Sequence, residues 1–292
     1  MKFLQKPPPL FVRFLNIRSF YIVGIVLLSL GLLYEWSSEK RSASIQEQLM
    51  LGGDQRGSLE EGLVLIESEE LVVVVATKTG AIVETRLKKH LVENVEGSLG
   101  FRVFGQSNES AFNYYFKSGF TGVSPSYVVL ERGNDFVTLY DEVLDITKAI
   151  SFLPSPYEIS IYDYSSKGVN GKSFAGLYRT EGRALDLKRD ALSGGMMNNS
   201  SYEGVAISSE RDPYNTYRLS RIDEKKEVLT RSGWIAFVQK YFFAALIGSD
   251  EHIYNYQVFP KDSGIYRMGY TVEGSSGAVS KKHEHRLFVG PK

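Results

Sequence analysis

The chain has 292 residues, with 34 basic and 34 acidic side chains, 43% apolar residues and no cysteine. This balance of charge provides no basic face for a nucleic-acid partner, and the lack of cysteine excludes thiolate catalysis, disulfides and cysteine metal sites. A domain outside the cytoplasm would therefore depend on its apolar core for stability.

Residues 1–18 form a basic N-terminal segment. It contains Lys2, Lys6, Arg13 and Arg18 but no acidic residue, and it includes the run Pro7-Pro8-Pro9. A triple proline cannot continue a helix, so we expect an extended tail. Because positively charged segments remain in the cytoplasm, the tail predicts a cytoplasmic N-terminus.

Residues 19–36 predict a transmembrane helix. The uncharged run from Ser19 to Tyr34 is rich in Ile, Val and Leu, and 16 residues of helix span about 24 Å of the ~30 Å hydrocarbon layer. A longer apolar surface and anchoring side chains at both interfaces can supply the remainder. The predicted membrane-anchor residues are Arg18, Tyr21, Tyr34 and Trp36. We therefore expect a single membrane pass, with the residues after Trp36 on the far side of the membrane.

A cleaved signal peptide would share the basic start and the apolar middle of this segment. Such peptides end at a small-x-small site, whereas this run ends in the bulky residues Tyr34, Glu35 and Trp36. The nearest small-residue site, Ser42-Ala43-Ser44, lies late. The pattern favours an uncleaved anchor and leaves cleavage as the alternative.

Residues 37–62 are rich in Ser, Glu, Gln and Gly and predict a linker. From residue 63 onward, short runs of β-forming residues are separated by turn residues, which predicts strands over most of residues 63–292. Expected strands include 63–66, 71–77, 81–87, 101–104, 111–116, 127–131, 136–141, 146–153, 157–164, 172–179, 202–208, 253–259, 264–273 and 283–289. So many closely spaced strands without alternating helices predict a mainly β domain, an antiparallel sandwich.

One segment departs from the strand pattern. Aromatic and apolar residues at positions 234, 237, 238, 241 and 242 follow the spacing i, i+3, i+4, i+7, i+8 of a helix face. The spacing predicts a helix over 234–242, followed by a strand over 243–247. Such a helix would pack on an open end of the sheet, or its aromatic face would contact a membrane protein or lipid. The candidate partner contacts are Trp234, Phe237, Tyr241 and Phe242.

The sequence contains no nucleophile elbow, phosphate loop or dinucleotide fingerprint. His283-Glu284-His285 on a strand would direct both imidazoles to one face and supply half of a metal site. The pair lacks an evident third ligand, and a solvated strand end beside Lys281 and Lys282 is the favoured interpretation. We therefore predict no enzyme activity and no cofactor or metal.

The chain resembles the N-terminal part of the Gram-negative YidC membrane protein insertases. The most specific similarity is the Gly-Trp…Tyr-Phe…Ala pattern in residues 233–247, followed by the Gly-Pro-Lys ending at residues 290–292. Residues 77–83 and 202–206 resemble an early turn-and-strand and a later strand of the same family.

This resemblance implies a periplasmic β-supersandwich akin to galactose mutarotases, with one or two short helices and a preceding transmembrane helix. It implies a single-pass protein of the bacterial inner membrane, with most of its chain in the periplasm. It also implies work beside the Sec translocon and its accessory subunits, assisting nascent membrane proteins at the lipid bilayer. The chain departs from the family at Gly248-Ser249, where a proline is common, and its proline-bearing tail is longer.

The sequence up to Lys292 lacks the five further helices of the family's insertase core. The chain is thus expected to be either a fragment of an insertase or a shortened relative. Two other functions stay open. One is a mutarotase-like enzyme or carbohydrate-binding domain, which would need a histidine such as His90 or His252 near a cleft carboxylate. The other is a purely structural tethered domain.

Overall fold

The computed structural model describes residues 62–91, 100–105, 114–180, 204–239, 241–262, 264–273 and 281–292. The chain divides into two units, residues 1–52 and 53–292. The predicted tail and anchor, and the predicted linker up to residue 61, lie outside the described residues. Among the described residues, no helix has the length and apolar character needed to cross a bilayer.

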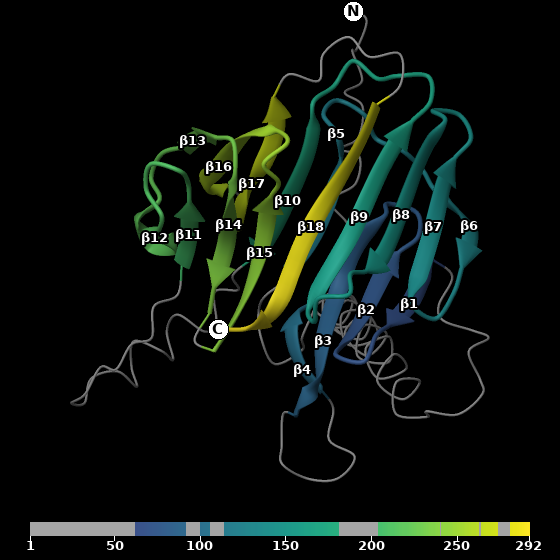
Figure 1. Cartoon of the computed structure of the whole chain (residues 1–292), viewed down its shortest axis with the longest axis horizontal. Coiled ribbons are helices and arrows are strands. Elements are labelled where there is room, and N and C mark those ends of the chain that lie inside the picture. The colour runs from purple at the N-terminus through teal and green to yellow at the C-terminus, as the bar shows by residue number, and fades with distance from the viewer. Residues whose placement is uncertain are drawn as a thin grey trace, which may run out of the picture. The chain divides into compact units, whose positions relative to one another are not determined.

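The described residues fold into two nine-stranded antiparallel sheets (Figure 1). Sheet one has the order β1 (Leu63–Glu67), β2 (Leu71–Ala76), β3 (Ala81–Leu91), β5 (Tyr114–Phe120), β10 (Ser173–Thr180), β17 (Ile265–Glu273), β16 (Ile253–Asp262) and β13 (Lys226–Thr230), with β4 (Gly100–Phe104) paired to β3. Sheet two has the order β12 (Asn215–Arg218), β11 (Gly204–Ser208), β14 (Gly233–Val238), β15 (Phe242–Gly248), β18 (Lys281–Pro291), β9 (Glu158–Ser165), β8 (Ile146–Phe152), β7 (Phe136–Asp141) and β6 (Val128–Arg132). A single-turn 3-10 helix, η1 (Leu219–Arg221), joins β12 to β13.

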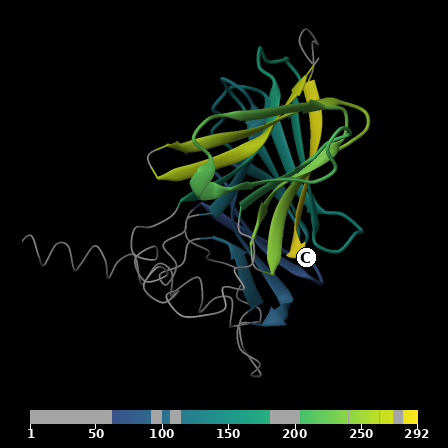
Figure 2. The same ribbon diagram turned by 90° about the vertical axis from the view of Figure 1, so that its left-hand side faces the viewer.

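The two sheets pack face to face around one apolar core, and Figure 2 shows them from the side. Strand alternation supplies the core, because side chains two positions apart point to the same face. On β7, for example, Val137 and Leu139 are fully buried while their neighbours are half-buried. The predicted mainly β supersandwich is confirmed by this architecture.

The predicted helix over 234–242 is wrong. Residues 233–238 form β14 and residues 242–248 form β15, and these two strands pair in antiparallel register. Both faces of β14 carry apolar side chains, so apolar residues occur at helical spacings without a helix. Tyr241 lies in the turn between the two strands. The strand predicted over 243–247 is confirmed.

Gly233 opens β14 in a backbone conformation that side chains disfavour, with φ of +116°. A Cβ atom there would lie 2.1 Å from the carbonyl oxygen of Ser208 on the neighbouring strand β11. Strands β11 and β14 can therefore pair closely at this point because residue 233 has no side chain.

We predict that Gly233→Ala lowers the free energy of unfolding by more than the about 1–3 kcal/mol typical of a disfavoured backbone conformation, because the methyl group also clashes with backbone. Gly264→Ala is the matched control, since Gly264 has φ of +86° but no atom within 4 Å of a built Cβ. Denaturant unfolding of both variants measures the difference. Equal losses would show that the contact with Ser208 has no energetic weight.

Candidate functional site

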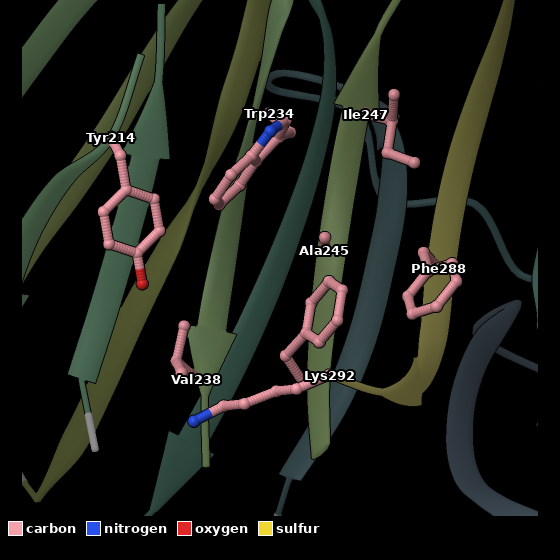
Figure 3. Close-up of a pocket in the computed structure, with 8 residues that line it drawn as sticks. Tyr214, Trp234, Val238, Ala245, Ile247, Phe288 and Lys292 are labelled. Carbon is pink, nitrogen blue, oxygen red and sulfur yellow. The ribbon is translucent and has the colours of Figure 1, made fainter. Parts of the chain in front are cut away.

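The outer face of sheet two carries an apolar groove with a volume of about 490 Å³ (Figure 3). Its lining residues come from the chain around β12 and from β14, β15 and β18, together with the last residue. They are Tyr214, Trp234, Val238, Phe243, Ala245, Ile247, Phe288 and Lys292. We call this feature the apolar groove.

Small residues in neighbouring strands lie beneath the apolar groove, and Ala245 among them lines it. Ala206, Ala236 and Ala245 lie side by side on β11, β14 and β15, because Ala236 is the register partner of both others. All three are buried, and they belong to one apolar cluster on this face of the sheet. A row of alanines leaves a trough where larger side chains would stand above the sheet.

Larger side chains two residues away along each strand form the walls. Trp234 faces Ile247 on one side of the alanine row, and Val238 faces Phe243 on the other. Tyr214 extends the first wall, with its ring centre 6.0 Å from that of Trp234. The positions of Trp234 and Val238 on β14 differ by four residues, which corresponds to about 13 Å along a strand.

Phe288 on β18 and Lys292 also border the groove. The Phe288 ring stacks on Phe243 with centres 4.8 Å apart. Gly290 permits this arrangement, because a Cβ there would lie 2.8 Å from the ring of Phe288. Figure 3 shows the Lys292 side chain reaching toward Val238, so a single ammonium group borders an otherwise apolar surface.

The structure separates the four predicted contact residues. Trp234 lines the groove and Tyr241 is 62% exposed in the adjacent turn. Phe237 points to the opposite face of β14, is fully buried and packs edge-on against Tyr114. Phe242 is 9% exposed and stacks on Phe101, with ring centres 4.3 Å apart. Phe237 and Phe242 therefore serve the core.

A second feature is polar and lies between the sheets. We call it the buried ionic cluster. Lys148 on β8 and Asp163 on β9 form an ion pair of 2.6 Å, and both side chains are completely buried. Ser118 Oγ on β5 donates to Asp163 at 2.6 Å and accepts from Lys148 Nζ at 2.6 Å. The cluster thus joins sheet two to sheet one.

His285 on β18 extends the buried ionic cluster. Its Nε2 lies 3.4 Å from Asp163 Oδ2 and 3.2 Å from Ser173 Oγ, and its Nδ1 lies 2.9 Å from the Tyr270 hydroxyl. Burial raises the pKa of Asp163, but the attraction of Lys148 and the hydrogen bond from His285 outweigh it and hold that pKa below its usual value. Burial lowers the pKa of Lys148, partly offset by Asp163.

The histidines on β18 are buried, contrary to the predicted solvated strand end. The two imidazoles do share one face, as predicted, but His283 is 5% exposed and His285 is fully buried. Lys281 is also buried and donates to the carbonyl oxygen of Gly171 at 2.6 Å. The described residues include no group of three or more histidine, cysteine or acidic side chains placed to hold a metal ion.

His283 continues the row of imidazoles toward the surface. Its ring centre lies 4.6 Å from that of His285 and 4.9 Å from that of the half-buried His252. Burial, together with the neighbouring His285 and His252, lowers the pKa of His283 to about 3. His283 is therefore neutral at neutral pH in the folded chain.

The sequence contains a pattern that indicates the apolar groove but none that indicates the buried ionic cluster. The alternation Trp234, Ala236, Val238 marks one face of a strand, and it would have indicated the groove once the segment was assigned as a strand. Lys148 and Asp163 gave no signal, since single charged residues within short strands are typical of solvated faces.

The comparisons agree on one family. The model of the "YidC periplasmic domain" family matches residues 63–292. "Membrane protein insertase YidC" of Wigglesworthia glossinidia brevipalpis is 26% identical over 259 residues, covering 80% of this chain and 47% of the relative. The protein of the same name from Azotobacter vinelandii is 26% identical over 258 residues, covering 79% of this chain and 44% of the relative. The chain thus spans about half the length of these curated relatives.

Solved structures similar to this chain include mutarotase-type proteins. A galactose mutarotase related enzyme from Lactobacillus acidophilus has a TM-score of 0.46 and 7% identity, covering 78% of this chain and 97% of that one. A mutarotase-type protein from Salmonella typhimurium has a TM-score of 0.44 and 7% identity, covering 79% and 90%.

We predict that the chain loses stability as the pH falls below about 6.5. His283 has a lower pKa folded than unfolded, so the unfolded state binds more protons in this range and the stability present above pH 6.5 is lost toward pH 3. Between pH 7 and pH 5 this group alone accounts for about 2 kcal/mol at ~1.4 kcal/mol per pKa unit. Denaturant unfolding of the wild type and His283→Gln across this range measures the difference. Parallel curves for the two proteins would contradict the assignment.

Proposed function

Because the chain belongs to the YidC periplasmic domain family, we propose that it is the membrane-tethered periplasmic part of a membrane protein insertase. Its role in this proposal is to bind partners while inner-membrane proteins are inserted and folded, and it is not catalytic. The supporting observation is the apolar groove, which is a built surface on the outer face of sheet two.

The shape of the apolar groove suits an apolar helix lying across the strands. The alanine row runs across the strands between the walls formed by Trp234 and Val238, so the apolar side chains on one face of a helix can enter it. An alanine floor allows close approach of such a helix, and Trp234, Phe243 and Phe288 present large apolar contact areas of the kind that dominate binding energies. Nascent membrane proteins supply helices of this kind.

The proposal keeps the predicted membrane topology. Residues 1–18 are the cytoplasmic tail, 19–36 the single transmembrane helix with Arg18, Tyr21, Tyr34 and Trp36 at its ends, 37–62 the linker and 63–292 the periplasmic domain. In this arrangement the domain is tethered to the membrane, and nascent helices and the Sec translocon with its accessory subunits would be its partners.

The alternative of a mutarotase-like enzyme has less support. Sugar epimerisation needs an acid and a base facing a substrate. The histidine–carboxylate pair formed by His285 and Asp163 has 0% exposure on both side chains. Both groups lie in the buried ionic cluster between the two sheets, where a sugar cannot reach them.

We predict that a photo-reactive amino acid at Phe288 of the full chain forms adducts in cells with a nascent inner-membrane protein. We expect these adducts because an apolar helix of the nascent protein would contact Phe288 when it lies in the groove. The matched control is the same replacement at Tyr162, which is 36% exposed on β9 of the same sheet but outside the groove.

A second control uses a nascent chain whose apolar helix is interrupted by polar residues. We expect fewer adducts with this chain. Equal adducts from positions 288 and 162, or adducts that persist with the interrupted helix, would contradict the proposed role of the groove.

We also predict that the chain alone does not insert membrane proteins. A charged side chain costs about 2.5–3.5 kcal/mol at the bilayer centre, so insertion needs a polar path. Apart from tyrosines, Ser19 and Ser29 are the uncharged polar side chains of the predicted anchor, and one helix cannot enclose a hydrated path. Expression of residues 1–292 in cells depleted of their own insertase should leave growth unrestored. Restored growth with correct insertion of a small Sec-independent substrate would refute this.

A further inference from the structure

The outer face of sheet one carries a second cleft, with a volume of about 440 Å³, over β5, β10, β16 and β17. Its floor lacks side chains at two adjacent positions, because Gly176 on β10 is the register partner of Gly269 on β17. Gln257 on β16 continues this row as the partner of Gly269. We call this feature the glycine-floored cleft.

Residues two positions away along each strand form its two rims. Tyr178 and Arg267 are register partners on one rim, which continues to Phe259. Phe174 and Thr271 are partners on the other rim. The cleft therefore has aromatic rings on both sides and polar groups between them, a composition typical of small-molecule sites.

The charge of the cleft comes from Arg267. None of the described residues that line it is acidic. The Arg267 guanidinium stacks on the Phe259 ring at 3.8 Å from its centre, so its plane is held in place. A planar guanidinium fork with fixed orientation suits a carboxylate, which it can bind through two parallel hydrogen bonds.

The remaining polar groups suit hydroxyl groups on the same ligand. Gln257 Nε2 donates to Glu227 Oε1 at 2.9 Å, which fixes the amide and leaves its carbonyl oxygen as an acceptor. Thr271 on the rim, with Thr121 and Ser124 in the adjoining loop, adds three hydroxyl groups. These three hydroxyl groups and the carbonyl oxygen of Gln257 can accept hydrogen bonds from hydroxyl groups of a ligand.

The aromatic rim is preorganised. The Tyr178 ring stacks on Tyr115 with centres 4.9 Å apart and an angle of 3°. It also lies over Gly176, since a Cβ at Gly176 would be 3.1 Å from this ring. The C–H groups of a ligand ring can therefore pack against Tyr178 without reordering the rim, which lowers the entropic cost of binding.

From these contacts we infer that the glycine-floored cleft binds a sugar ring that carries a carboxylate, as in a uronic acid. Arg267 holds the carboxylate, Gln257 and the rim hydroxyls bond to the ring hydroxyls, and Tyr178 and Phe174 pack against the apolar edges of the ring. This site is on the opposite outer face from the apolar groove and does not depend on the function proposed for it.

Titration of the full chain in detergent with glucuronate, followed by ligand-observed NMR, tests this inference. We expect saturable binding of glucuronate and at least tenfold weaker binding of glucose, which lacks the carboxylate. Arg267→Gln should weaken glucuronate binding at least tenfold, because a hydrogen bond to a charged group is lost. Arg267 is exposed, so this variant should keep its fold, which its melting temperature checks.

The matched control is Arg132→Gln, an exposed arginine on the edge strand β6 of sheet two. It should bind glucuronate as the wild type does. Absence of saturable glucuronate binding, equal binding of glucose, or equal weakening by the two arginine variants would overturn the inference.

Discussion

The fold depends on how an ion pair is accommodated between two β-sheets. Lys148 and Asp163 are fully buried, and removing two charges from water costs several kcal/mol per ion unless nearby groups compensate. Here the compensation comes from both sheets, since Ser118 bonds to both charges and His285 contacts Asp163. A slip of one residue in any of these strands would point its member of the cluster outward. The cluster therefore favours a single register in six strands: β5, β10 and β17 of sheet one and β8, β9 and β18 of sheet two.

That register also positions the outer faces, because successive residues of a strand point in opposite directions. On β10, Ser173 points to the cluster while Phe174 lines the glycine-floored cleft. On β18, His285 belongs to the cluster and Phe288 belongs to the apolar groove. Each outer site is thus held by strands whose inner side chains are fixed by charge pairing and close packing. Sites on such strands are more precise than sites on loops.

Much of the fold could be predicted from strand-forming runs, and the strand at 136–141 was predicted to the residue. The edge strands β12 and β13 were missed, since they contain few apolar residues and alternate between exposed and half-buried positions. The helix predicted around Trp234 is wrong because both faces of β14 are apolar. The strand therefore lacks the alternation of apolar and polar residues that distinguishes a strand from a helix. The buried histidines could not be found from sequence, because the partners of His285 lie on strands distant in the chain. Pairing of β18 with β9 brings Asp163 to it, and the packing of the two sheets brings Ser173 and Tyr270.

The two stretches that carry the most specific family resemblance meet at the apolar groove, and packing explains only part of their composition. Packing explains the two glycines. A side chain at Gly233 would clash with Ser208, and one at Gly290 would clash with Phe288. Phe237 and Phe242 serve the core. Trp234 and Phe243 are different, because they stand half-buried on the outer face, where they line the apolar groove. A large apolar side chain left partly in water contributes less to folding than one in the core. Such side chains gathered around an alanine floor are better explained by a partner that buries them on binding.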